Sequence, residues 1–395
     1  MSWKIQSLMT QRNEFVHLAS QADVNFAALC RRYGISRKTG YKWHRRFLAE
    51  GPTALADRSR RPRTSPWQCA AAVQAAVVSL RKKHPAWGPR KLRRRLADLG
   101  RSDLPATSTV AAMLRRAGCI SSLATAQHQP MQRFERAQPN ELWQMDFKGH
   151  FALGRGGRCH PLTVLDDHSR FLVGLQACTD ECGQTVRTRL ITLFRHYGLP
   201  EAILCDNGSP WGSGTGEHTT LGVWLLRVGV RVLHGRPRHP QTQGKDERFH
   251  RTLKDELLAR EDWPDAARVQ RRFNHFRDLY NLERPHEALA LAVPATRYQP
   301  SLRAYSETLP SLHYQPGELI RNVKSKGEIT FRNRFFYVGR AFAGLPVALR
   351  PMANEGCFHV CLGAHRLGQI NLAQPNDRPF GNYFPMLPVP HIIQS

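Results

Sequence analysis

The chain has 395 residues, of which 41% are hydrophobic and 23% charged, a composition that provides buried cores and excludes a disordered protein. Its 58 Lys and Arg residues against 31 Asp and Glu give a net charge of +27, which favours a polyanionic partner, nucleic acid first. No apolar run of about 18 residues is present, so a membrane-spanning helix and a membrane partner are not expected. Nine scattered cysteines predict reduced thiols and a cytoplasmic protein.

Residues 1–65 are predicted to form a helix-turn-helix domain with a basic arm. A helix from Val24 ends in a turn at Gly34, and the second helix that follows is rich in cations. This second helix is the one that enters the major groove, although a solvated charged face is the ordinary alternative. The arm is expected to follow phosphates or the minor groove. The predicted DNA-binding cations here are Arg37, Lys38, Lys42, Arg45, Arg46, Arg58, Arg60 and Arg61.

Residues 66–120 are predicted to form a second helical DNA-binding domain. Its helices read CAAAVQAAVVSLRKKH, GPRKLRRRLADLG and STVAAMLRRA, the last with a good N-terminal cap. Residues 121–140 have no hydrophobic periodicity and are predicted to be a linker.

From residue 141 to 300 the pattern changes to alternating strands and helices. Strands are predicted at 143–153 and in a hairpin at 159–178, followed by a helix at 183–198, the strand AILC, a further helix and the strand VRVLH. Two helices, at 244–260 and 266–281, complete a mixed sheet flanked by helices. Short strands between 310 and 395 predict a small C-terminal β-barrel.

Three carboxylates in the 141–300 region are candidates for chemistry. Asp146 lies inside the apolar strand WQMDF, where an acid has to be paired or bound to a metal. Asp206 ends the strand AILC, and Glu247 lies in the first turn of a helix. Carboxylates from two strand ends and one helix can converge on Mg²⁺, and two such ions can clamp the attacking and leaving oxygens of a displacement at phosphorus.

Ordinary structural roles compete with these assignments. Asp206-Asn207-Gly208, taken alone, reads as a turn, because Asn and Gly tolerate positive φ. Asp166, Asp167 and Asp180 are interpreted as hairpin and turn residues.

The ordered motifs WQMDF, LDDHSRF, GLPEAILCDNGSPW, HPQTQGKDERFHRTLKDEL and YNLERPHEAL resemble the integrase core of DDE transposases from bacterial insertion sequences, which is similar to retroviral integrase. HPAWGPRKLRRRL is similar to the DNA-binding half of these proteins. The resemblance implies an α/β ribonuclease-H-like core, which agrees with the predicted mixed five-stranded sheet. With the α-helical helix-turn-helix modules and the small C-terminal β-barrel read from the sequence pattern, the expected protein is multidomain.

The resemblance also implies roles for particular residues. Asp146, Asp206 and Glu247 match the three catalytic, metal-binding acids; the adjacent Asp246 is the alternative third ligand, and the ERFHRTLK frame favours Glu247. Cations on the same helix match groups that contact DNA, namely Lys245, Arg251 and Lys254.

The function implied is a transposase that binds the terminal inverted repeats of its element. It would hydrolyse a phosphodiester with two Mg²⁺ ions, for which Mn²⁺ can substitute, and transfer the freed 3′-OH to target DNA. Its expected partners are double-stranded DNA, at element ends and target, and further copies of itself in a homo-multimer associated with the bacterial nucleoid. Two alternatives stay open: a catalytically degenerate DNA-binding regulator, and a structure-specific nuclease on the same fold.

Overall fold

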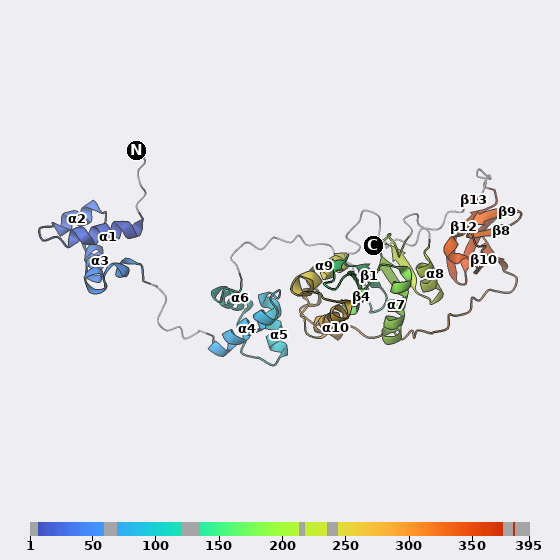
Figure 1. Ribbon diagram of the computed structural model, residues 1–395, viewed down its shortest axis with the longest axis horizontal. Coiled ribbons are helices and arrows are strands. Elements are labelled where there is room, and N and C mark those ends of the chain that lie inside the picture. The colour runs from blue at the N-terminus through green and yellow to red at the C-terminus, as the bar shows by residue number, and fades with distance from the viewer. Residues whose placement is uncertain are drawn as a thin grey trace. The chain divides into compact units, whose positions relative to one another are not determined.

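The computed structural model describes residues 7–58, 69–120, 135–212, 218–234 and 244–373, and the backbone of 382–383. It divides into two compact units, Met1–Gln68 and Cys69–Ser395 (Figure 1). Arg60, Arg61 and most of the predicted linker lie outside the described residues. Within the described residues, no helix is long and apolar enough to cross a membrane.

The first unit is a bundle of three helices, α1 (Leu8–Ala19), α2 (Phe26–Arg32) and α3 (Arg37–Glu50), followed by the short helix η1 (Pro52–Leu55). Side-chain oxygens of Ser7, Asn25 and Ser36 accept a backbone N–H in the first turn of each α-helix, which satisfies one donor that the helix leaves unpaired. Phe15 and Trp43 pack at its centre. The predicted helix-turn-helix is therefore confirmed.

The second unit begins with three further helices, α4 (Ala71–Lys83), α5 (Pro89–Asp98) and α6 (Thr107–Arg116). Proline opens α5 at a position where a missing N–H costs nothing. Trp87, Leu92 and Val110 are fully or almost fully buried between the three helices. We call residues 69–120 the second helical module.

A mixed sheet forms the centre of the second unit. Its strands are β1 (Trp143–Phe147), β2 (Phe151–Ala152), β3 (Arg158–Asp166), β4 (Leu172–Cys178), β5 (Ala202–Cys205) and β6 (Arg231–His234). They run in the order β2-β3-β1-β5-β6, with β4 paired to β3. The pairs β1–β5 and β5–β6 are parallel, whereas β1–β3 and β3–β4 are antiparallel. The predicted five-stranded mixed sheet is confirmed, with β2 as a short addition.

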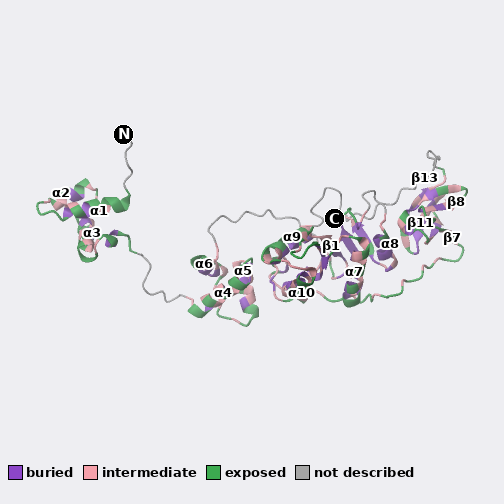
Figure 2. Cartoon of the chain, viewed as in Figure 1, coloured by how far each residue is buried: buried purple, intermediate pink, exposed green. Residues whose placement is uncertain are grey.

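Helices cover both faces of this sheet, and side chains alternate between the faces along each strand. Trp143 and Met145 join the core under α7 (Gly183–Tyr197) and α8 (Thr220–Arg227). The opposite face packs against α9 (Gly244–Leu253), the π-helical turn η3 (Lys254–Leu258) and α10 (Ala266–Leu282). Figure 2 shows buried residues along β1 and on α7 and α8.

The C-terminal region, where a barrel was predicted, consists of two small sheets. One is ordered β12-β11-β10-β7 and the other β13-β9-β8, and the described strands do not close into a barrel. The barrel prediction is corrected to this extent, because short strands of alternating hydrophobicity do not specify whether their edges pair. Val223 and Leu226 of α8 join the core of this domain. Its strands are β7 (Leu319–Asn322), β8 (Glu328–Phe331), β9 (Arg334–Tyr337), β10 (Pro346–Pro351), β11 (Cys357–Leu362), β12 (His365–Asn371) and β13 (Asn382–Tyr383).

Candidate active site

Asp146 and Asp206 are brought together by the parallel pairing of β1 and β5. Trp143 pairs with Ile203 and Gln144 with Leu204. Continuing this register by two residues sets Asp146 beside Asp206. Because the carboxyl ends of parallel strands lie at one edge of the sheet, both acids occupy the position where ligands commonly bind in α/β folds.

The two acids are neighbouring carboxylates, of which Asp146 is partly buried and Asp206 is more exposed. Burial first, and then the charge of Asp206, raise the pKa of Asp146 to about 6. The pKa of Asp206 is also raised, chiefly by burial. The charge of Glu181 raises the pKa of both carboxyl groups further. This repulsion between carboxylates is relieved by a bound cation, so their chemistry fits a hard divalent metal.

The first turn of α9 offers two candidate third acids, and they lie in different environments. Glu247 is exposed. Asp246 is fully buried, and neither of its carboxylate oxygens has a hydrogen-bond partner. Burial raises the pKa of Asp246 well above its usual range, and the charges of Asp146 and Asp167 act in the same direction. The oxygen of the Gln144 amide, on the same face of β1 as Asp146, is likewise buried without a partner.

The third carboxylate is not assembled with the first two. In the described part of the chain, no three side chains of His, Cys, Asp or Glu lie close enough together to hold a metal ion. Asp146 and Asp206 therefore supply two oxygen ligand groups that fit Mg²⁺, and Glu247 or Asp246 must move to complete a three-carboxylate site. Mg²⁺ is commonly held by one or two carboxylates together with substrate phosphates.

Two further groups of this site were not assigned to it from the sequence. His250 on α9 is buried, its Nε2 lies 2.9 Å from Thr163 Oγ1, and its Nδ1 lies 4.0 Å from Asp146 Oδ2. Burial lowers its pKa to about 4, so it is neutral at physiological pH. Glu181 Oε1 accepts a hydrogen bond from His160 Nδ1 at 2.8 Å. His250 had a usable signal, since it follows Asp246 by four residues on one helical face; Glu181 had none.

The turn after β3 has the structural role that the sequence predicts. Asp166 accepts hydrogen bonds from the backbone N–H groups of Asn140 and Ser169, each at 2.8 Å. Asp167 accepts one from Gln144 Nε2 at 2.7 Å and forms an ion pair with Lys245. Both aspartates are fully buried. Asp180 lies in a different turn, between β4 and α7, where it accepts a hydrogen bond from Cys182 N at 2.9 Å.

The described DNA-binding cations that the sequence predicts lie in four environments. On α3, Arg37, Lys38, Lys42 and Arg45 are exposed, and Arg46 lies partly over the Trp43 ring. On α9 and η3, Arg251 and Lys254 are exposed. Lys245 is mostly buried beside Asp167, and burial lowers its pKa to about 8. Arg58 forms an ion pair with Glu50.

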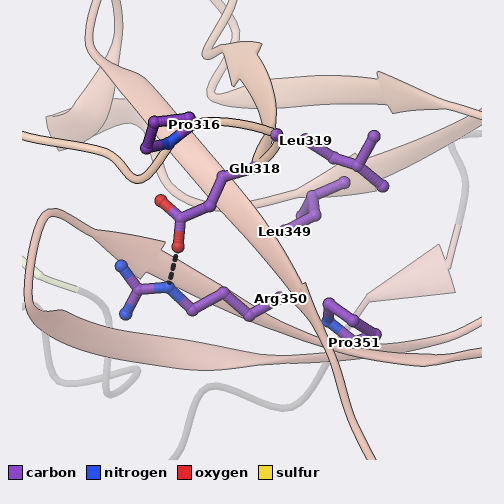
Figure 3. Close-up of a pocket in the computed structure, with 7 residues that line it drawn as sticks. Pro316, Glu318, Leu319, Leu349, Arg350 and Pro351 are labelled. Atoms are coloured by element: carbon purple, nitrogen blue, oxygen red, sulfur yellow. Dashed lines mark hydrogen bonds and ion pairs between the residues drawn. The ribbon is translucent and has the colours of Figure 1, made fainter.

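The C-terminal domain contains an open hollow between β7 and β10 (Figure 3). Arg350 Nε donates to Glu318 Oε1 at 2.6 Å across it, and the rest of the lining is proline, glycine and leucine. The hollow contains none of the acids or cations predicted from the sequence, so it contributes nothing to the candidate active site.

Family comparisons agree with this arrangement. Residues 136–240 and 228–294 match the integrase core domain, and residues 318–378 match the C-terminal domain of IS481 family transposases. Residues 11–63 match a helix-turn-helix domain, and residues 39–114 match a homeodomain-like domain.

Individual relatives point the same way. An uncharacterized 31.7 kDa protein of insertion element IS407 from Burkholderia multivorans is 29% identical over 40% of this chain and 54% of that protein. An uncharacterized 39.2 kDa protein of insertion element IS476 from Xanthomonas euvesicatoria is 26% identical over 57% of this chain and 64% of that protein. The chain thus spans less than two thirds of the length of either relative.

Among solved structures, the simian T-cell lymphotropic virus intasome, in complex with PP2A regulatory subunit B56 gamma, is 16% identical over 72% of this chain and 91% of that chain, with a TM-score of 0.38. The family matches and the insertion-element relatives confirm the predicted resemblance to insertion-sequence transposases with a retroviral-integrase-like core.

Proposed function

We propose that this chain, which carries helix-turn-helix domains and an integrase core domain, is a transposase that binds the terminal inverted repeats of its own mobile element and joins them to target DNA. The observation that carries the proposal is the juxtaposition of Asp146 and Asp206, which sets two carboxylates at the carboxyl edge of parallel strands. Their raised pKa values indicate a site built to receive positive charge.

The proposed reaction has two displacements at phosphorus. In the first, a water oxygen bonds to phosphorus at the element end, the P–O3′ bond breaks, and the 3′-OH leaves with a proton. In the second, that 3′-OH bonds to a target phosphorus and displaces the target 3′-OH. Two bound Mg²⁺ ions would supply activation of the attacking oxygen and stabilisation of the leaving one; we expect Mn²⁺ to substitute.

The chain's own groups have defined parts in this proposal. Asp146, Asp206 and Glu247 hold the ions, with Asp246 as the alternative to Glu247. Neutral His250 lies beside Asp146 without adding a competing cation, because burial lowers its pKa to about 4. Arg251 and Lys254, exposed on the α9 side, contact the backbone of the element end.

DNA binding and assembly follow from the same proposal. The exposed cations of α3, together with Arg58, Arg60 and Arg61, read or hold the terminal repeats of double-stranded DNA. Two ends have to be held together for paired joining, so we propose a homo-multimer that acts in the bacterial cytoplasm on nucleoid DNA. A native mass measurement with flanking DNA that detects only monomers would remove the multimer from the proposal.

The proposal is tested with a supercoiled plasmid that carries the gene with its genomic flanks, purified full-length protein and Mg²⁺. A transposase gives both cleaved ends and joined products. A structure-specific nuclease gives cleavage without joining, and a regulator gives salt-sensitive binding to the flanks with neither product.

A further inference from the structure

Two sequence motifs that the active site does not use meet at one carboxylate of a third motif, that of Glu256. Glu256 lies in the π-helical turn η3, which continues α9 without a break. Arg284, from the motif YNLERPHEAL, donates to Glu256 Oε1 through Nε at 2.9 Å and through Nη2 at 2.8 Å. Trp87, from the motif HPAWGPRKLRRRL, donates its indole N–H to Glu256 Oε2 at 3.1 Å.

The contact is buried, so its hydrogen bonds are not in competition with water. The side chains of Arg284 and Glu256 are 6% and 9% exposed, and Trp87 is 1% exposed. A buried, bidentate Arg–carboxylate pair is geometrically specific, and removal of one partner leaves an unpaired charge. Hydrogen bonds from Arg284 and from Trp87 therefore hold the Glu256 carboxylate in one position.

Trp87 itself is rigidly held within the second helical module. His84 stacks on its ring with centroids 3.9 Å apart, and Arg81 donates to its carbonyl oxygen at 2.6 Å. A second link joins the same module to α10 and its end, where Arg95 Nη2 donates to Glu283 Oε2 at 2.6 Å and Leu279 packs against the module's core. The module is thus fixed to the catalytic domain at the helix that follows Glu247.

We infer that Glu256 is a positioning residue. Through Glu256, the position of the second helical module fixes the position of α9 and hence that of Glu247. π-helical turns inside α-helices are rare and frequent at functional sites, and η3 is the turn that turns Glu256 toward both partners. The contact is independent of the proposed function; its catalytic consequence rests on that function. Glu256 touches neither DNA nor reacting atoms and acts through the helix alone.

The test uses the full-length protein and two matched pairs of variants. Trp87→Phe removes the indole donor and keeps an aromatic ring. Trp263→Phe is its control: Trp263 Nε1 donates to the carbonyl of Leu258, the last residue of η3, at 3.2 Å, so this variant removes an indole hydrogen bond to η3 that does not come from the second helical module. Glu256→Gln is paired with Glu261→Gln, which weakens the Arg272–Glu261 ion pair of the same domain.

The first readout is amide hydrogen exchange along α9 and η3, with and without a duplex made from the genomic flank of the gene. In the wild type the duplex is expected to slow exchange there. Trp87→Phe and Glu256→Gln are expected to abolish this slowing and to speed exchange without DNA by roughly tenfold, the effect of about 1.4 kcal/mol. If the duplex does not change the amide exchange rates of α9 and η3 in the wild type, the inference is wrong.

The second readout is the single-turnover rate of end cleavage at saturating flank DNA, beside the affinity for that DNA. Trp87→Phe is expected to lose about tenfold in rate and to keep its affinity, while Trp263→Phe keeps both. Equal rates for the two variants would refute the positioning role. If the wild type cleaves nothing but the exchange pattern is as expected, the proposed function fails and the coupling between module and core stands.

Discussion

Asp146 on β1 lies beside Asp206 at the end of β5, because these strands are parallel neighbours whose register pairs Gln144 with Leu204. The charge of Asp206 acts on Asp146, and the partial burial of Asp146 reduces the screening of this repulsion by water. The arrangement costs stability in the absence of a cation. Destabilising arrangements of charge of this kind are concentrated at functional sites.

Removing one of these carboxylates is therefore expected to stabilise the metal-free protein while it abolishes activity. Asp146→Asn removes the repulsion, and we expect a gain of the order of 1 kcal/mol in the free energy of unfolding, measured with urea in the presence of a chelator. Asp180→Asn is the matched control. It is expected to lower stability, because hydrogen bonds keep the pKa of Asp180 below its usual range. A destabilised Asp146→Asn variant would contradict the account.

The adjacent acids of α9 are expected to respond differently to neutralisation. Glu247→Gln should abolish end cleavage with no large change in stability, since Glu247 is exposed. Asp246→Asn removes a fully buried, unpartnered carboxylate and should raise the free energy of unfolding by about 1–3 kcal/mol.

The stabilisation by Asp246→Asn should depend on pH. Since the folded-state pKa of Asp246 is raised, its contribution to stability is present below the unfolded pKa and is lost as pH rises through the folded pKa. The gain from Asp246→Asn should accordingly be larger at pH 8 than at pH 5 in chemical denaturation. If Asp246→Asn abolishes cleavage and Glu247→Gln retains it, Asp246 is the third ligand.

Protonation of His84 at acid pH should lower the free energy of unfolding of the second helical module. Burial lowers the pKa of His84 from 6.5 to about 4, so the unfolded state binds more protons between these values. Stability is lost as pH falls from 6.5 to 4, by up to roughly 3 kcal/mol for this group. His84→Gln should flatten the pH dependence of the unfolding free energy in this window. An unchanged slope would show that His84 is already exposed to solvent.

The exposed cations of α3 should contribute to DNA affinity through phosphate contacts. Arg45→Gln is expected to weaken binding to flank DNA and to reduce the slope of log affinity against log salt by about 1. Arg195→Gln removes the same charge from the exposed Arg195–Glu307 pair of the core and should leave the slope unchanged. Fluorescence anisotropy at several salt concentrations measures both; equal slopes for the two variants would exclude Arg45 from the interface.

The strand and helix order of the core was predictable because its signals are local. The strand that contains Asp146 alternates between two buried faces, and AILC is a short apolar run that ends at Asp206. Alternation and run length are read from neighbouring residues alone. The parallel register that joins these strands is not a local signal, and it is the structure that shows it.

Contacts over long sequence separations were not predictable in this way. The Glu256 contact joins residues 169 positions apart, and no local pattern indicates that an indole will meet that carboxylate. The sequence also did not predict which face of α9 points inward. Asp246 and Glu247 are adjacent acids, and only packing decides which of them is buried. Closure of the C-terminal barrel, which the described strands do not show, was unpredictable for the same reason, because it depends on the pairing of strand edges.

The central claim is tested most directly by one comparison on the flank-bearing supercoiled plasmid with Mg²⁺. Wild-type protein should yield cleaved ends and joined products, Asp180→Asn should yield the same, and Asp206→Asn should yield neither while it binds the flanks with wild-type affinity. Joined products from Asp206→Asn at the wild-type level would contradict the account, because no carboxylate beside Asp146 would then be needed.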